Sequence, residues 1–342
     1  MKDKSEIRLN LATREWVIFA PERRKRPKDF DKSAAGGKIP EYDPDCPFCP
    51  GNEDKLPEII SEIADSSGWH TRVVPNKFPA LERHYSSERY SRGIYTGMQG
   101  FGTHEVLIET PRHNGFPAAL SQREMEYIIE MYHRRYCEVL SDTRFQMCII
   151  FKNHGPAAGT SLEHPHSQLI GLGIVPRHIR TRENEAQRFY DIYNKCVFCH
   201  LMESELSHER RIVYENESFV GYIPYAADVP YQITIMPRRH RADFGNSSER
   251  ERKDMAIALQ NLLGRLHSKL NDPDYNLVLH SAPRYKEGEP HLHWYMEISP
   301  RITTKAGFEL GTGLSINPTL PELDADFLNN IDNNIGNDND KA

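Results

Sequence analysis

Residues 159–171, GTSLEHPHSQLIG, place two histidines on either side of a proline, directly after a glycine-containing loop. Side chains at positions i and i+2 of a strand point to the same face, so His164 and His166 share a face if this segment is extended. Proline fixes φ and removes a backbone donor, which stiffens the connection between them. Both imidazoles could hold a metal, or one could hold a metal while its neighbour reacts. The rest of the chain separates these alternatives.

Composition narrows the class of protein. The chain has 342 residues, enough for two domains, with 38% hydrophobic and 27% charged residues. Its formal charge of −6 disfavours a nucleic-acid-binding protein, because such domains usually carry a net positive charge. No run of about eighteen apolar residues predicts a membrane span, and the polar N-terminus does not resemble a signal peptide. We therefore expect a cytoplasmic protein with neither a nucleic-acid nor a membrane partner.

Four of the six cysteines form two Cys-x-x-Cys pairs, CPFC at residues 46–49 and CVFC at residues 196–199. In a reducing compartment this spacing is more typical of metal sites or redox centres than of structural disulfides. The first pair is flanked by prolines and lacks a helical pattern, which disfavours a thioredoxin-like redox motif. Metal binding is the favoured interpretation of both pairs.

Hydrophobic periodicity predicts alternating strands and helices. Two segments have apolar residues at helical spacing, residues 121–140 and residues 248–270, and Ser121 is a candidate N-cap of the first. Short apolar runs predict strands at residues 104–110, 145–153, 167–176, 231–237, 275–283 and 291–300. The expected fold class is α+β.

The order of these features repeats. Each half reads Cys-x-x-Cys, strand, histidine, helix, strand and a histidine-bearing strand. His164 lies 51 residues after His113, and His293 lies 53 residues after His240. We therefore expect two tandem copies of one unit, over residues 1–180 and 181–325. The Asn/Asp-rich residues 326–342 are expected to form a disordered tail.

Each half supplies two cysteines and two histidines, the donors that a structural zinc site uses in tetrahedral geometry. Two such sets at matching positions of the repeat are much stronger evidence for metal binding than a single set. The predicted ligand sets are Cys46, Cys49, His113 and His164 in the first half, and Cys196, Cys199, His240 and His293 in the second.

If His164 binds zinc, His166 is left beside the metal as a free imidazole, which suits a nucleophile for phosphoryl chemistry. Gln168 can offer an amide N–H to a phosphoryl oxygen. Ser161 and the backbone around Gly159 and Thr160 can hold the same phosphate. In the second half the matching positions hold Tyr295 and Glu297, so only the first copy keeps the nucleophile. A purely structural histidine is the alternative for His166.

These residues resemble the histidine-triad superfamily and, within it, the galactose-1-phosphate uridylyltransferase family. The resemblance rests on PERRKRP, CPFC, PNKFPAL, FGTHEVLIETPRH, FKNHGPAAGTSLEHPHSQ, PRRH, HLHW and GFELGTG. It implies two histidine-triad-type repeats, each an antiparallel sheet with a packed helix. It also implies a homodimer whose two zinc ions per chain are structural.

The resemblance implies a ping-pong reaction in which His166 takes UMP from UDP-glucose, releases glucose 1-phosphate and passes UMP to galactose 1-phosphate. By motif match, Arg23 and Arg26 contact phosphates, Asn76 and Asn153 hold the nucleotide, and Ser161 and Gln168 bind the transferred phosphoryl group. Gly307, Phe308 and Glu309 lie near the sugar and its phosphate.

The sequence departs from the common bacterial form of this family. That form has Gly at the position of Ser167, Asn-Pro at Leu162 and Glu163, and a second metal site of one Glu and three His. The CVFC pair is more similar to a plant branch that uses ADP-glucose, with phosphate as acceptor. An ADP-sugar phosphorylase or adenylyltransferase is therefore the alternative activity, and a non-catalytic, zinc-stabilised nucleotide-binding protein is a further one. His280 and His291 keep the common pattern, which leaves the second ligand set open.

Overall fold

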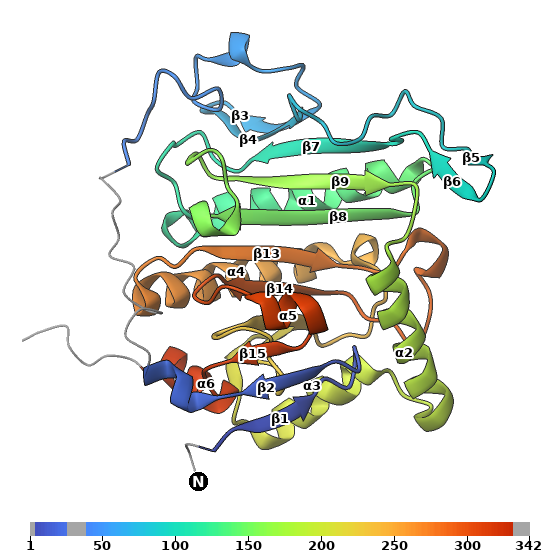
Figure 1. Cartoon of the computed structure of the whole chain (residues 1–342). Coiled ribbons are helices and arrows are strands. Elements are labelled where there is room, and N and C mark those ends of the chain that lie inside the picture. The colour runs from blue at the N-terminus through green and yellow to red at the C-terminus, as the bar shows by residue number, and fades with distance from the viewer. Residues whose placement is uncertain (1–3, 26–38, 331–342) are drawn as a thin grey trace, which may run out of the picture.

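The computed structural model describes residues 4–25 and 39–330, and a ten-stranded antiparallel sheet dominates it (Figure 1). From one edge to the other its strands are β10 (Ile212–Glu215), β11 (Phe219–Tyr222), β12 (Ile233–Pro237), β14 (Tyr295–Pro300), β13 (Tyr275–His280), β8 (Met147–His154), β9 (His166–Leu172), β7 (Gly102–Ile108), β4 (Gly68–Pro75) and β3 (Ser61–Asp65).

The two predicted repeats join edge to edge in this sheet. Strand β13 of the second repeat pairs with β8 of the first, with Asn276 opposite Asn153. The α+β class is confirmed, and the antiparallel sheet of each repeat is one half of a shared sheet. A sheet edge exposes unpaired N–H and C=O groups, and this pairing satisfies one edge of each half.

The registers of the two halves match. Gln168 of β9 lies between Val106 of β7 and Phe151 of β8. Glu297 of β14 lies between Thr234 of β12 and Val278 of β13 in the same antiparallel arrangement. Counting along these strands places Tyr295 at the position of His166, as the sequence repeat predicts.

Two long helices, α1 (Gln122–Ser141) and α4 (Glu249–Leu270), lie side by side behind the sheet (Figure 1). Both begin with a capping box, built from Ser121 with Glu124 and from Ser248 with Glu251. Their apolar faces enter one core that continues into β8 and β13, with Tyr132, Met255, Ile150 and Leu277 each no more than 1% exposed. Burial of this shared face stabilises the helices on the sheet.

The remaining elements surround this frame. A small sheet holds β1 (Glu6–Leu9), β2 (Trp16–Phe19) and β15 (Ser315–Asn317), and a separate hairpin holds β5 (Arg89–Arg92) and β6 (Tyr95–Met98). The shorter helices are α2 (Arg177–Tyr193), α3 (Val197–His208), α5 (Gly307–Thr312) and α6 (Pro321–Asn329). Within these described residues the predicted tail needs a correction: residues 326–329 are helical because α6 buries Leu328 in the core.

Replacing either N-cap serine tests the equivalence of the two repeats. Ser121→Ala and Ser248→Ala each remove an acceptor for a helix N–H, so each should lower the free energy of unfolding by about 1 kcal/mol. Denaturant titration measures this loss. Ser268→Ala, inside α4 and exposed, is the matched control and should stay within about 0.5 kcal/mol of wild type. Equal stability of all three variants would contradict the capping roles.

Candidate active site and metal centres

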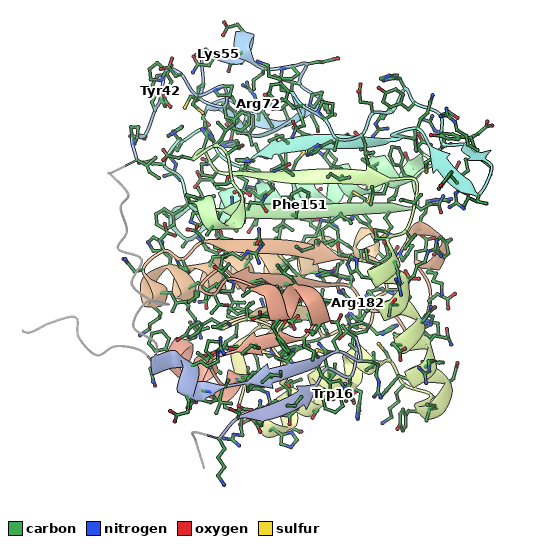
Figure 2. The ribbon with its side chains drawn as sticks, viewed as in Figure 1. Trp16, Tyr42, Lys55, Arg72, Phe151 and Arg182 are labelled. Atoms are coloured by element: carbon green, nitrogen blue, oxygen red, sulfur yellow. The ribbon has the colours of Figure 1, made fainter. Side chains whose placement is uncertain are left out.

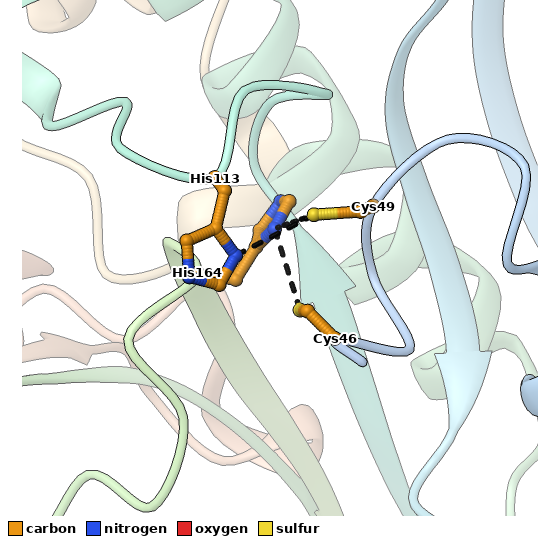
Figure 3. Close-up of side chains that lie close together, drawn as sticks. All are labelled: Cys46, Cys49, His113 and His164. Atoms are coloured by element: carbon orange, nitrogen blue, oxygen red, sulfur yellow. Dashed lines mark hydrogen bonds between the residues drawn. The ribbon is translucent and has the colours of Figure 1, made fainter. Parts of the chain in front are cut away.

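Four side chains converge from three segments of the first repeat, with Cys46 and Cys49 on one loop and His113 and His164 on two others (Figure 3). The possible donor atoms of Cys46, Cys49, His113 and His164 lie within 4.8 Å of one another, and all four residues are buried. His164 Nδ1 is 3.7 Å from each cysteine Sγ, and His113 Nδ1 is 3.5 Å from Cys49 Sγ. This S2N2 donor set is the kind that binds zinc tetrahedrally.

The groups around this cluster favour metal binding. His164 Nε2 donates to the Thr110 carbonyl oxygen at 2.8 Å, which leaves Nδ1 as the nitrogen with a lone pair. Burial lowers the pKa of His164 to about 4, so its imidazole is neutral at pH 7. Backbone N–H groups of Phe48 and Asp43 donate to Cys46 Sγ and Cys49 Sγ, both at 3.4 Å. Donation to sulfur stabilises thiolates, the form that binds metal.

A second group of donors lies in the second repeat. The donor atoms of Cys196, Cys199 and His240 lie within 4.8 Å of one another, and Cys199 Sγ is 3.3 Å from His240 Nδ1. Cys196 is the N-cap residue of α3, so this pair opens a helix, unlike the pair in the first repeat.

His293 stands next to this group. Its ring meets that of His240 edge to face, with centroids 5.3 Å apart, and His113 and His164 are also 5.3 Å apart in the first repeat. His293 Nδ1 donates to the Trp294 carbonyl oxygen at 2.9 Å, and its buried Nε2 has no hydrogen-bond partner. Burial lowers the pKa of His293 to about 4. A neutral imidazole with an unsatisfied buried nitrogen suits a fourth ligand.

The other two histidines considered for this site have different surroundings. His280 stacks on Tyr295, and its Nδ1 is 3.0 Å from Arg182 Nη1 of α2, which lies beside these strands (Figure 2). His291 Nδ1 is 3.5 Å from a carboxylate oxygen of Glu289. The buried Nε2 of His291, like that of His293, has no hydrogen-bond partner. None of these three histidines joins Cys196, Cys199 and His240 in the donor group found among the described residues, and only His293 has its ring against that of His240.

His166 begins β9 and is 7% exposed. Its Nδ1 donates to the backbone carbonyl oxygen of His164 at 2.8 Å, which leaves the Nε2 lone pair free. The edge of Phe48 lies against the ring, with centroids 5.6 Å apart. Burial lowers the pKa of His166, and the charge of Lys152 adds to the effect. The result is a neutral imidazole of fixed tautomer, which suits nucleophilic attack.

The glycine loop before β9 is held in place by the second repeat. Gly155 and Gly159 have φ of +82° and +89°, and a Cβ on Gly155 would lie 2.1 Å from Asp274 Oδ1. The Ala157 N–H donates to the same carboxylate, and Asn276 Nδ2 donates to the Ala158 carbonyl oxygen at 2.9 Å. Thr160 Oγ1 donates within the loop to the carbonyl oxygen of residue 162, and Ser161 is exposed.

Two predicted amide side chains have their oxygens occupied by protein donors. Gln168 Oε1 lies 2.8 Å from His104 Nε2, and Asn153 Oδ1 accepts from Asn276 Nδ2 at 2.8 Å. Each amide therefore keeps its N–H2 group as a donor. Together with the loop, these donors can hold an anionic group near His166. His104 and Asn276 were not predicted from the sequence.

The other residues predicted to contact the substrate lie in separate parts of the chain. Arg23 is exposed in a short 3-10 helix at residues 21–25, and Arg26 lies outside the described residues. Gly307, Phe308 and Glu309 belong to α5, between β14 and β15 in chain order, where Phe308 is 46% exposed. Glu309 accepts a hydrogen bond from the N–H of residue 306 and caps its own helix. The structure does not bring these α5 residues against His166 within one chain.

A buried polar network lies behind His166, and it was not predicted from the sequence. Lys152 Nζ donates to Glu109 Oε2 at 2.7 Å and to the His166 carbonyl oxygen at 3.3 Å. Ser167 Oγ donates to Glu109 and lies 2.5 Å from Tyr132 Oη. Ser167 is fully buried and lies on the opposite face of β9 from His166, so it faces the core. Charged residues inside the apolar runs VLIE and CIIFK were the available signal.

Comparison with known families identifies the family of the chain. The family model for the galactose-1-phosphate uridyl transferase N-terminal domain matches residues 1–176, and that for the C-terminal domain matches residues 180–326. The chain belongs to this family. It is 32% identical to the ADP-glucose phosphorylase of Arabidopsis thaliana, over 93% of this chain and 90% of that protein. It is 28% identical to a galactose-1-phosphate uridylyltransferase of Thermotoga maritima, over 93% and 95% of the two chains.

Solved structures give the same result. An Arabidopsis thaliana ADP-glucose phosphorylase with bound ADP-glucose matches with a TM-score of 0.83 and 30% identity, over 96% of this chain and 99% of that one. A uridylyltransferase structure matches with a TM-score of 0.73 and 25% identity, over 95% and 97%. The protein is a nucleotidyltransferase of the histidine-triad superfamily. Among the described residues, the helices are too short or too polar to cross a membrane.

The buried network predicts a specific stability pattern. Lys152→Met leaves the Glu109 carboxylate buried without its cation, which should cost about 3–5 kcal/mol of unfolding free energy. The double variant Glu109→Gln with Lys152→Met removes both charges and should recover much of that loss. Denaturant unfolding at pH 7 measures both. A double variant no more stable than Lys152→Met would show that pairing with Glu109 is not what Lys152 contributes.

Proposed function

We propose that the protein transfers a nucleotidyl group from a nucleoside diphosphate sugar through a covalent intermediate on His166. His166 Nε2 attacks the α-phosphorus, a P–N bond forms, and the bond to the β-phosphate oxygen breaks, releasing sugar 1-phosphate. A phosphate oxygen of the acceptor then attacks the same phosphorus and frees the histidine. The observation that carries this proposal is the hydrogen bond from His166 Nδ1 to the His164 carbonyl oxygen, which leaves a neutral Nε2 free.

The donors near His166 hold the phosphoryl oxygens as charge develops on them. We assign this role to the Gln168 amide, the Ser161 hydroxyl and the backbone of Gly159 and Thr160. Asn153 and Asn76 would hold the nucleotide. Arg23 and Arg26 would contact its phosphates, for which the planar guanidinium is suited.

ADP-glucose is the first candidate donor, with inorganic phosphate as acceptor. Support comes from the Arabidopsis relatives and from the second Cys-x-x-Cys pair, which lies with His240. UDP-glucose with galactose 1-phosphate, the substrates inferred first from the sequence, is the second candidate, supported by the Thermotoga relative. Both pairs use the same bond changes at His166.

We propose that both donor groups hold zinc in a structural role. Cys46, Cys49, His113 and His164 provide four ligands in the first repeat. In the second repeat Cys196, Cys199 and His240 would be completed by His293, whose ring meets that of His240 as the ring of His164 meets that of His113. Zinc at the first site would anchor His164, and the carbonyl of that residue orients His166. The metal would therefore act on geometry and not on the phosphorus.

We also propose a homodimer. Within one chain α5 does not contact His166, and Phe308 on α5 remains exposed. A second chain could bring Gly307, Phe308 and Glu309 to the sugar end of the site, where the family resemblance places them.

Covalent labelling tests the reaction. Incubation with ADP-glucose or UDP-glucose labelled at the α-phosphate, followed by alkaline denaturation, should leave label on the wild-type chain, because a phosphoramidate survives alkali. His166→Ala should take up no label, whereas His208→Ala, on the exposed end of α3, should label normally. The nucleotide that labels faster is the substrate, and release by phosphate or by galactose 1-phosphate identifies the acceptor. A wild-type chain that binds either nucleotide without labelling would indicate a non-catalytic binding protein.

Elemental analysis tests the metal assignment, with about two zinc ions expected per wild-type chain. Cys46→Ser and Cys196→Ser should each lose about one, because one thiolate ligand is removed. The exposed Cys137→Ser is the matched control and should keep both. His293→Ala should lower the zinc content or affinity of the second site, and His291→Ala should not. The reverse order would move the fourth ligand to His291.

A further inference from the structure

His104 occupies a position on β7 that connects three parts of the proposed phosphoryl site. Its Nε2 lies 2.8 Å from Gln168 Oε1 and 3.1 Å from Asn76 Nδ2. Its Nδ1 lies 3.2 Å from the backbone nitrogen of Ala80, and its carbonyl oxygen accepts from the Asn76 N–H at 2.9 Å. His104 therefore ties the loop of residues 76–80 to the strand that carries His166.

The contacts define which nitrogen of His104 carries the proton. The Ala80 N–H can only donate, so Nδ1 must accept and is unprotonated. The proton then lies on Nε2, which donates to the Gln168 carbonyl oxygen. A flipped Gln168 would point its N–H2 group at this N–H, donor against donor. The tautomer of His104 and the orientation of the Gln168 amide thus determine each other.

The consequence is a fixed donor on Gln168. With Oε1 bound to His104, Gln168 keeps its N–H2 group for another acceptor. Asn76 is oriented in the same way, because its Oδ1 accepts from the Phe78 N–H at 2.9 Å. Its Nδ2 then lies 3.1 Å from the same His104 N–H, also donor against donor, so Gln168 Oε1 is the acceptor that this N–H has among the described contacts. Two amide donors beside one histidine are suited to an anionic oxygen.

The second repeat provides an internal comparison. By strand register, Gln232 is the counterpart of His104 and Glu297 is the counterpart of Gln168. A glutamate carboxylate offers no N–H2 group, and Gln232 Oε1 instead accepts from the Asp228 N–H at 2.6 Å. The repeat that has Tyr295 in place of the nucleophile thus also lacks this arrangement of donors.

We propose that His104 is a positioning residue that holds the Gln168 amide with its N–H2 group toward the transferred phosphoryl group. This inference rests on the proposed function and deepens it. His104 acts through Gln168 and does not itself touch the reacting atoms. Because the amide is already oriented before substrate arrives, its stabilising effect requires no reorientation during attack.

Two isosteric variants separate this role from a structural one. His104→Asn keeps an acceptor near Nδ1 for Ala80 but loses the Nε2 donor, whereas His104→Gln keeps a donor near Nε2. In single-turnover labelling, His104→Asn should form the nucleotidyl-enzyme at least about tenfold more slowly, since the lost donor alignment acts mainly in the transition state. His104→Gln should restore most of the rate. KM, zinc content and melting temperature should change little in either variant.

Dependence on Gln168 is the second test. In a Gln168→Ala background, His104→Asn should cause little further loss of rate, because the residue through which it acts is already absent. Equal impairment by Asn and Gln at position 104, or additive losses with Gln168→Ala, would overturn the proposal.

Binding separates failure of this inference from failure of the proposed function. If the wild-type chain takes no label from either sugar nucleotide, the proposed function fails, and titration with AMP or UMP tests His104 by itself. Binding weakened several-fold by His104→Asn and restored by His104→Gln would support the positioning role. Unchanged binding in both variants would refute it.

Discussion

The site depends on one hydrogen bond at the start of β9, from His166 Nδ1 to the carbonyl oxygen of His164. It selects the tautomer of His166 and directs its lone pair to Nε2. Its acceptor belongs to a residue whose ring lies among two cysteines and another histidine and whose Nε2 is bound to a backbone carbonyl. Each imidazole therefore uses one nitrogen for orientation and keeps the other for its task. The two rings of the HPH segment have opposite assignments of Nδ1, which suits the different roles proposed for the histidines on either side of Pro165.

Much of this arrangement was readable from the sequence. The sequence patterns predicted the α+β class, both long helices and the N-cap Ser121 of the first, and the repeat assigned Tyr295 to the position of His166. These features are carried by short-range patterns, such as capping boxes and hydrophobic periodicity, that survive without tertiary information. The four ligands predicted for the first cluster also converge. They could be chosen from the sequence because two Cys and two His are a donor set typical of structural zinc sites.

The features that could not be predicted from the sequence depend on how strands distant in sequence align in the sheet. Nothing local shows that β13 pairs with β8 and so brings Asn276 beside Asn153. The same holds for His104, whose two nitrogens meet Ala80 and Gln168 only after β7 and β9 align. Lys152 and Glu109 were visible as charges within apolar runs, but their pairing required the sheet. The last turn of α6 was read as disordered because its polar composition hid one buried leucine.

The continuous sheet also gives a structural role at the proposed site to the second repeat, which has Tyr295 at the position of His166. Asp274 and Asn276 reach from β13 and its approach to clamp the glycine loop of the other half. The second repeat thus supports the glycine loop of the first repeat, and the boundary between the two repeats runs through the proposed phosphoryl site. The residues proposed for catalysis lie in one copy while the other copy holds their loop in place, so neither half on its own contains the whole proposed site.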